Sequence, residues 1–212
     1  MFNAIVFWTS YFILKLFMKI YFYGKSYGLK NYPEKGPYIA VINHESALDV
    51  PVMALAVPGR ARGIAKESLF KIPILGWWLK AIGLIPVKRG ASDQEAFNRS
   101  LKILRNGEVF FIAPQGTRKL KPGETKRRAR TGVIRLAQLA DCLVVPVGVT
   151  GTREALSPKA HFPRRVPLRV KVGKPIKLPK VEVTMENREK LQEQAEYLME
   201  EVYRLCEELG EK

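Results

Sequence analysis

A histidine and an aspartate in the segment NHESALD, residues 43–49, are residue types that general base catalysis can use. A carboxylate bonded to one imidazole nitrogen fixes the tautomer and stabilises the imidazolium, which leaves the other nitrogen free as a base. His44 and Asp49 would lie about 140° apart on a regular helix, so they can meet only if His44 lies in a turn before the helix. The alternative is structural, because Ser46 and Asp49 could also form a capping-box-like pair.

A basic segment, APQGTRKLKPGETKRRAR at residues 113–130, has the composition of an anion site. Its seven lysines and arginines from Arg118 to Arg130 are opposed only by Glu124. A Pro-Gln-Gly turn within it offers backbone N–H groups, and Arg118 offers a planar guanidinium fork that suits a phosphate. A solvated basic loop without a ligand is the alternative.

The elements that must position these residues alternate between strand and helix. Short apolar runs rich in β-formers predict strands, and Ser92 with Glu95 predicts a capping box at a helix start. Alternating spacings of four and three from Leu191 to Leu209 predict an amphipathic C-terminal helix. The predicted strands are residues 37–43, 59–66, 84–90, 108–114, 142–150 and 168–176, and the predicted helices are residues 46–57, 92–107, 131–140 and 191–209.

This order predicts a single α/β domain with a central mixed, largely parallel sheet flanked by helices. Ligands in such folds gather beyond the strand ends. The segments NHESALD and PQGTRK each follow a predicted strand, so both could open onto one cleft. Lys88 and Arg89 end a third apolar run, and Lys66 ends a fourth.

The charge balance favours an anionic partner. The 212 residues include 36 lysines and arginines against 20 acidic residues, a net charge of +16, which suits a membrane surface, a phosphorylated substrate or an acidic carrier protein. No nucleic acid is predicted as a partner, because the aromatic residues cluster near the N-terminus rather than among the basic residues. Cys142 and Cys206 lack metal-type spacing and are predicted to be reduced core residues, so neither a metal nor a cofactor is expected.

Residues 1–24 are predicted to be a membrane-anchoring helical segment, and residues 25–212 the catalytic domain. The uncharged run 2–14 would span roughly 20 Å as a helix, short of a hydrocarbon core of about 30 Å. Lys15 and Lys19 share one helical face, and aromatic residues surround them, as in interfacial segments. A helix or bent helix pair in one leaflet is favoured; a single span and a buried core helix are the alternatives.

Four motifs together resemble those of the glycerolipid acyltransferases. They are NHESALD, GLIPVKR, PQGTR and VVPVGV, and they occur in the order and approximate spacing of that family between residues 25 and 180. Within the family, the chain is similar to the bacterial 1-acyl-glycerol-3-phosphate acyltransferases. Two residues depart from the usual third motif, because Ala113 and Gln115 stand where the family has Phe and Glu.

The resemblance implies a role for each matching residue. His44 would be the general base and Asp49 its orienting partner, with no acyl-enzyme nucleophile. The phosphorylated acceptor would be bound by the remaining motif residues. These are Lys66, Arg89, Gln115, Gly116, Thr117 and Arg118.

The implied reaction is transfer of an acyl group from a thioester of acyl-carrier protein or coenzyme A to the 2-hydroxyl of lysophosphatidic acid. The product would be phosphatidic acid for phospholipid biosynthesis, made by a monotopic protein of the cell inner or cytoplasmic membrane with its catalytic domain on the cytoplasmic side. Glycerol-3-phosphate or another lysophospholipid is an alternative acceptor. A different class, a non-catalytic basic protein that binds anionic membranes, would explain the N-terminus and the basic loop but not His44 and Asp49.

Overall fold

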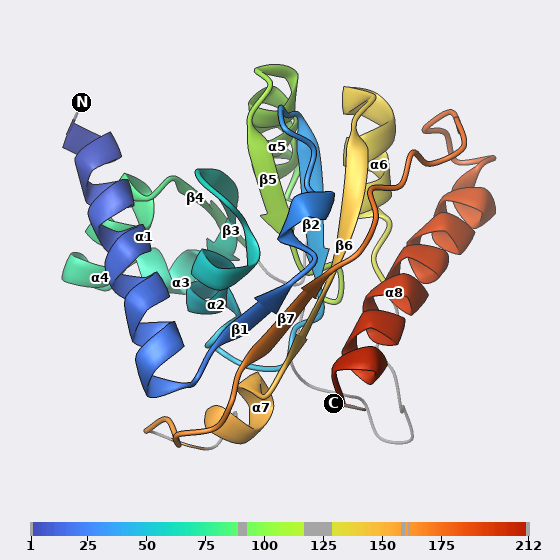
Figure 1. The fold of residues 1–212 in the computed structure, drawn as a ribbon. Coiled ribbons are helices and arrows are strands. Elements are labelled where there is room, and N and C mark those ends of the chain that lie inside the picture. Colours follow the sequence, from blue (N-terminus) through green and yellow to red (C-terminus); the bar gives the residue numbers. More distant parts are fainter. Residues whose placement is uncertain (1, 89–92, 117–128, 158–159, 161, 211–212) are drawn as a thin grey trace.

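A computed structural model describes residues 2–88, 93–116, 129–157, 160 and 162–210. It has a central sheet with helices against both faces (Figure 1). The single α/β domain with a mixed, mostly parallel sheet that the sequence predicts is therefore confirmed.

The sheet has the order β1-β7-β6-β2-β5-β3-β4 among the described residues. Strands β6, β2, β5, β3 and β4 run parallel to one another, whereas β7 is antiparallel to β6 and β1 is parallel to β7. The strands are β1 (Lys25–Tyr27), β2 (Tyr38–Ile42), β3 (Ala61–Lys66), β4 (Leu84–Val87), β5 (Val109–Ile112), β6 (Leu143–Thr150) and β7 (Arg169–Val172).

Helices form a layer on each face of the sheet (Figure 1). Side chains of α1, α2 and α4 pack with one set of strand residues, and side chains of α5, α6 and α8 pack with the other. The helices are α1 (Phe2–Tyr21), α2 (Asp49–Ala56), α3 (Glu67–Phe70), α4 (Pro73–Ala81), α5 (Gln94–Arg105), α6 (Gly132–Ala140), α7 (Thr152–Ala155) and α8 (Arg188–Gly210), with a short 3-10 turn at Leu29–Asn31.

Strand β2 lies in the middle of this arrangement and is buried on both faces. Tyr38, Ala40 and Ile42 pack against the α1, α2 and α4 layer, and Ile39 and Val41 pack against the other layer. A strand that is covered on both faces is continuously apolar, which is why the sequence signal for β2 is clear. The buried strand gives a fixed base for the polar residues that follow it.

Two helix starts differ from the prediction. Helix α2 begins at Asp49 rather than at residue 46, because residues 43–48 form the turn that leaves β2. The first turn of α5 is capped by Asp93, whose side chain accepts from the backbone N–H of Ala96, so the assignment of Ser92 as the cap was wrong. Ser92 itself lies outside the described residues.

The N-terminal segment forms the one helix α1 in the structure. The stretch Asn3–Tyr21 is long and apolar enough to cross a membrane, and 11% of its most apolar window is buried inside the protein. Phe7, Tyr11 and Met18 along α1 and Phe22 just beyond it are buried against the domain. The short strand β1, which follows α1, was not predicted from the sequence.

The cap at Asp93 gives a test of the local fold. Its two carboxylate oxygens accept from the N–H groups of Ala96 and Lys88, and these bonds lower the pKa of Asp93. Asp93→Ala is expected to reduce the free energy of unfolding by about 1 kcal/mol at neutral pH, measured by urea unfolding. A lowered folded-state pKa stabilises the protein above the ordinary aspartate pKa, so the difference should vanish as the pH falls through the lowered value.

Asp93→Asn is the matched control, because its amide oxygen keeps an acceptor for one of the two N–H groups. The difference in free energy of unfolding between Asp93→Asn and Asp93→Ala should not depend on pH over this range. Equal stability of wild type and Asp93→Ala at neutral pH would contradict the assignment of the cap.

Candidate active site

The parallel strands bring the predicted site segments to one edge of the sheet. His44 follows β2, Gln115 follows β5, Lys66 ends β3 and Lys88 follows β4. The carboxyl ends of parallel strands meet at the same edge, where ligands bind in open α/β sheets. The segment NHESALD and the start of PQGTRK thus lie at the same edge of the sheet. That both open onto one cleft stays a prediction.

Asn43 controls how the chain leaves strand β2. The backbone pairing of β2 with β6 ends at Ile42 opposite Val147. Beyond it, the Asn43 amide donates to the Val149 carbonyl at 2.8 Å and accepts from the Val149 N–H at 2.9 Å. The buried side chain thus takes the place of the next rung of backbone hydrogen bonds. The backbone itself is free to turn away from the sheet at His44.

The Asp49 side chain ties the turn together. Its Oδ2 atom lies 2.7 Å from Nδ1 of His44 and accepts from the backbone N–H groups of Glu45 and Ser46, each at 2.8 Å. Asp49 is completely buried, whereas the His44 side chain is 13% exposed. The contact of Asp49 with Ser46 and its contact with His44 therefore occur together, on one oxygen atom. The capping box itself was wrong, because α2 begins at Asp49 and its N-cap is Leu48, which makes no side-chain capping bond.

This arrangement determines what the imidazole can do. An ionised carboxylate can only accept hydrogen bonds, so the proton between the two side chains belongs to Nδ1 of His44. Nε2 is then the unprotonated nitrogen of the neutral ring, and the partial exposure of the ring allows a substrate to approach. A histidine held in this tautomer by a buried carboxylate has the geometry of a general base.

Ser46 fastens the same turn to helix α7. Its buried hydroxyl donates to the Leu156 carbonyl at 2.7 Å and accepts from the Leu48 N–H at 3.2 Å. Glu45 forms an ion pair with Arg153 of α7 at 3.3 Å. The turn is thus anchored to the segment that follows β6, not only to its own helix.

Gln115 lies almost completely inside the protein, with 3% of its surface exposed. Its Oε1 atom accepts from the backbone N–H of His44 at 2.6 Å, and its Nε2 atom donates to the hydroxyl of Tyr203 at 2.5 Å. Gly116, the next residue, has a left-handed φ of 64°, a conformation that favours glycine.

Both cysteines are thiols, with Cys142 buried and Cys206 partly buried. Burial raises the pKa of Cys142 to about 11. Burial, opposed by a weak hydrogen bond to Val149 and reinforced by nearby carboxylates including Asp49, raises the pKa of Cys206 to about 12. Neither thiol is a thiolate at neutral pH, so neither suits a nucleophile. Both are unpaired, as the sequence predicts.

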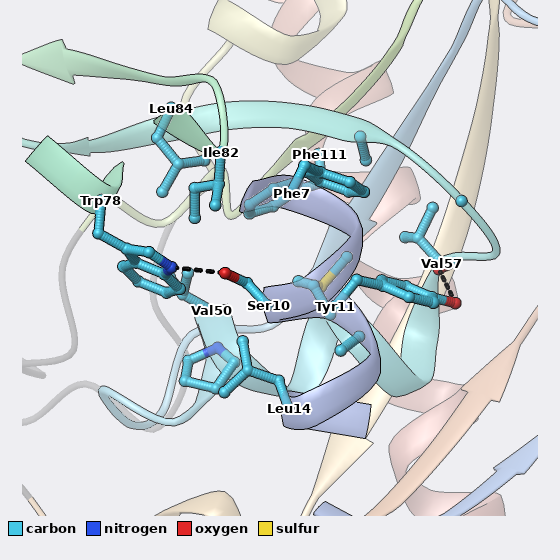
Figure 2. Close-up of a pocket in the computed structure, with 15 residues that line it drawn as sticks. Phe7, Ser10, Tyr11, Leu14, Val50, Val57, Trp78, Ile82, Leu84 and Phe111 are labelled. Carbon is cyan, nitrogen blue, oxygen red and sulfur yellow. Dashed lines mark hydrogen bonds between the residues drawn. The ribbon is translucent and has the colours of Figure 1, made fainter. Parts of the chain in front are cut away.

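An apolar pocket lies between α1, α2 and α4, next to the start of α2 (Figure 2). Val50 and Pro51, which directly follow Asp49, line it together with Phe111. Its polar groups are paired, because Trp78 Nε1 donates to Ser10 Oγ at 2.8 Å and the Tyr11 hydroxyl donates to the Val57 carbonyl at 3.3 Å. The cavity volume is about 70 Å³. Within the described part of the chain, no cluster of acidic, histidine or cysteine side chains could hold a metal ion.

The family model for acyltransferases matches residues 25–150. This is more than half of the 212 residues and includes β2, His44, Asp49 and Gln115. The chain belongs to the acyltransferase family.

Several relatives of this chain carry one name, 1-acyl-sn-glycerol-3-phosphate acyltransferase. A protein of Saccharomyces cerevisiae is 28% identical over 179 residues, which cover 83% of this chain and 57% of the yeast protein. A chloroplastic protein of Arabidopsis thaliana is 33% identical over 59% of this chain and 35% of its own length, and a Bacillus subtilis protein is 28% identical over 60% and 62%. The matched regions thus span roughly a third to two thirds of these relatives.

The fold of this chain is also similar to that of a solved structure. The crystal structure of an LPA acyltransferase, PlsC, from Thermotoga maritima covers 99% of this chain and 88% of the bacterial one, with a TM-score of 0.76 at 24% identity. The likeness supports the observed arrangement of the sheet and its helices.

Some of the predicted anion-binding residues of this chain are among the residues that the structure describes, and others are not. Gly116 lies at the sheet edge with Gln115, and Lys66 is exposed at the end of β3. Arg89, Thr117 and Arg118 lie outside the described residues, as does most of the basic segment 113–130.

Three groups that contact the candidate active site of this chain cannot be predicted from the sequence motifs. They are the Leu156 carbonyl, the Val149 backbone and the Tyr203 hydroxyl. Two of the three are backbone groups, which every residue type supplies. Tyr203 lies on α8, beyond the region that the family model matches, and next to the apolar stripe rather than on it.

Asp49 is expected to set the tautomer of His44. In the wild type, the neutral ring should carry its proton on Nδ1. Asp49→Asn should lower the share of this tautomer, because an amide oxygen is a weaker acceptor and an amide nitrogen can itself donate to Nδ1. Nitrogen-15 spectra of ring-labelled histidine, recorded where the ring is neutral, measure the ratio.

The chain has only two histidines, so His161→Ala is enough to assign the signals. An unchanged tautomer ratio in Asp49→Asn would show that another group orients the ring.

Proposed function

We propose that this acyltransferase moves an acyl group from a thioester to the 2-hydroxyl of 1-acyl-glycerol-3-phosphate, giving phosphatidic acid for phospholipid biosynthesis. The observation that carries the proposal is the contact between buried Asp49 and the partly exposed imidazole of His44. The names of the relatives support the choice of acceptor. Glycerol-3-phosphate and other lysophospholipids present a similar hydroxyl and phosphate, so they are the acceptors to compare.

In the proposed reaction, Nε2 of His44 removes the proton of the acceptor hydroxyl as its oxygen attacks the thioester carbonyl. The new C–O bond forms, and the C–S bond breaks as the tetrahedral intermediate collapses. The proton held by the imidazolium passes to the departing thiol, so His44 returns to its starting state. Asp49 stabilises the imidazolium between these steps.

Phosphate binding is assigned to basic residues near the sheet edge. Arg118, with Gly116 and Thr117, would hold the phosphate of the acceptor, and Lys66 and Arg89 would contribute positive charge. The exposed position of Lys66 at the end of β3 supports this part of the proposal. A guanidinium can meet a phosphate with two parallel hydrogen bonds, which an ammonium cannot.

The apolar pocket beside Val50 offers a place for part of an acyl chain (Figure 2). It is much smaller than the roughly 300–1,000 Å³ of ordinary small-molecule sites, so it would hold a segment of the chain rather than all of it. The thiol carrier, coenzyme A or acyl-carrier protein, is acidic, so the net charge of +16 on the protein would attract it from solution.

Membrane attachment is proposed through two neighbouring apolar surfaces. One is the outer face of α1 and the other is the α3–α4 segment, where Ile74 is 84% exposed and Trp77 is 53% exposed. The two elements pack together and are joined by the Trp78–Ser10 hydrogen bond. Large apolar side chains rarely gather on the surface of a protein unless they meet a partner or a bilayer. The exposed apolar side chains are Ile5, Trp8, Phe12, Ile13, Leu16, Phe17 and Ile20 on α1, and Leu69, Ile72, Ile74 and Trp77 on or beside α3 and α4.

Attachment to a single leaflet fits this packing better than a span. Buried Phe7, Tyr11, Met18 and Phe22 follow the whole length of α1 and hold it lengthwise against the domain. A spanning helix would have to lose these contacts to cross the bilayer. We therefore propose a monotopic enzyme with α1 parallel to the membrane surface, and we keep the cytoplasmic side, which the sequence analysis expects, as part of the proposal.

The catalytic part of the proposal is tested by His44→Ala. The rate of phosphatidic acid formation should fall by about 10²–10⁴-fold, the usual contribution of a general base. Product is measured by chromatography, with 1-acyl-glycerol-3-phosphate, glycerol-3-phosphate and other lysophospholipids each tested against coenzyme A and carrier-protein thioesters.

His161→Ala removes the other histidine and should retain wild-type activity. Near-normal activity in His44→Ala would overturn the assigned base. If the wild-type protein forms no product with any acceptor, the non-catalytic membrane-binding alternative is favoured instead.

Membrane attachment is tested by substitution, since deleting α1 would also remove buried core residues. Ile74→Ser with Trp77→Ser, and separately Phe12→Ser with Leu16→Ser, should each weaken binding to vesicles of anionic lipid by about 10- to 100-fold. Full burial of one large apolar side chain in the bilayer would contribute roughly 1.5–3 kcal/mol to binding. The four substituted side chains are already partly buried in the protein, so each contributes less. Sedimentation with vesicles measures the bound fraction.

Met185→Ser is the control, because Met185 is 82% exposed but lies just before α8, away from both surfaces. Binding that survives both double substitutions would show that the apolar surfaces do not meet the membrane.

A further inference from the structure

Gln115 has a fixed orientation that assigns it a role. The backbone N–H of His44 can only donate, so the Gln115 atom that faces it must be the carbonyl oxygen. The amide nitrogen therefore faces Tyr203, and the Tyr203 oxygen accepts from it. Both ends of the Gln115 amide are thus engaged inside the protein, at a position that is 3% exposed.

We propose that Tyr203, acting through Gln115, is a positioning residue that fixes the backbone of His44 for acyl transfer. This inference rests on the proposed function and replaces the contact between Gln115 and the acceptor that the motif implies. Asp49 holds the imidazole from one side, and the Tyr203–Gln115 pair holds the main chain of the same residue from the other. A shift of about 1 Å in a reacting group can cost 10²-fold in rate, so the second support bears directly on turnover.

Helix α8 is suited to this role because it is held close to the sheet near Tyr203. A Cβ on Gly148 of β6 would come within 2.8 Å of the backbone of Leu205 and Cys206, so the helix approaches the strand as closely as glycine allows. Arg169 donates to the Leu209 carbonyl at 3.1 Å, and Lys171 pairs with Glu208. Tyr203 therefore projects from a rigid support.

The unusual glutamine fits the same arrangement. A glutamate at position 115 would accept on both oxygens, so the Tyr203 hydroxyl would have to donate to it instead. A hydroxyl can do either, so Gln115→Glu keeps the link by reversing one hydrogen bond. Phenylalanine at position 203 can do neither and breaks the link with either residue.

The kinetic test compares Tyr203→Phe, Gln115→Glu and the double variant with the wild type. Tyr203→Phe should lower kcat about 3- to 30-fold, the range of one or two lost buried hydrogen bonds, while KM for thioester and acceptor stays within about twofold. Gln115→Glu should stay within about threefold of wild type. In the double variant, the buried carboxylate at position 115 has no hydroxyl donor at position 203, so kcat should fall below that of Tyr203→Phe.

Tyr197→Phe is the matched control, because Tyr197 lies on the same helix, is 49% exposed and makes no described contact with Gln115. An unchanged kcat in Tyr203→Phe would overturn the proposal. A raised KM for the acceptor at unchanged kcat would also overturn it, and would return Gln115 to substrate binding.

A second measurement does not depend on the choice of acceptor. Selective nitrogen-15 labelling of histidine gives two backbone amide signals, of which one is His44. Tyr203→Phe should move the His44 amide proton upfield and speed its exchange with solvent, and Tyr197→Phe should leave both unchanged. An unmoved signal overturns the positioning role even if no acyl transfer is found. A moved signal in a protein that acylates nothing would instead reject the proposed function alone.

Discussion

One oxygen atom organises this site. Oδ2 of Asp49 accepts from the imidazole of His44 and from two successive backbone N–H groups. These three donors can converge only if residues 44–46 curl around the first residue of α2. The same atom thus sets the conformation of the turn and orients the ring. Because all three bonds converge on one buried carboxylate, the shape of the turn and the chemistry of the histidine cannot vary independently.

The sequence predicts the parts of this arrangement that depend on residue type and short spacing. The strands β2 and β6 are long apolar runs, and the alternation of strand and helix gives the sheet and the edge where NHESALD lies. The spacing of His44 and Asp49 also shows that the two side chains can meet only if the histidine precedes the helix. What it leaves open is which interaction the aspartate makes, because a cap and a catalytic partner require the same side chain at the same place.

Other features escape prediction for physical reasons. The strand β1 is three residues long and is stabilised by pairing with β7, far away in the chain. The cap of α5 was assigned to Ser92 when the adjacent Asp93 is also a favoured capping residue. The partners of Asn43 and Ser46 are backbone groups on β6 and beside α7, so no residue type marks them. The glutamine at position 115 can be noticed as a departure from the family, but its two partners depend on the tertiary fold.

The connection between α1 and the sheet has a consequence for how such a protein would work on a bilayer. Only residues 22–24 separate α1 from β1, and they are held by hydrogen bonds from Leu168 to the Phe22 carbonyl and from Gly24 to the Met18 carbonyl. No flexible linker therefore separates α1 from the sheet. With α1 in the membrane interface, the short connection would hold the rest of the domain at one depth and one tilt relative to the bilayer.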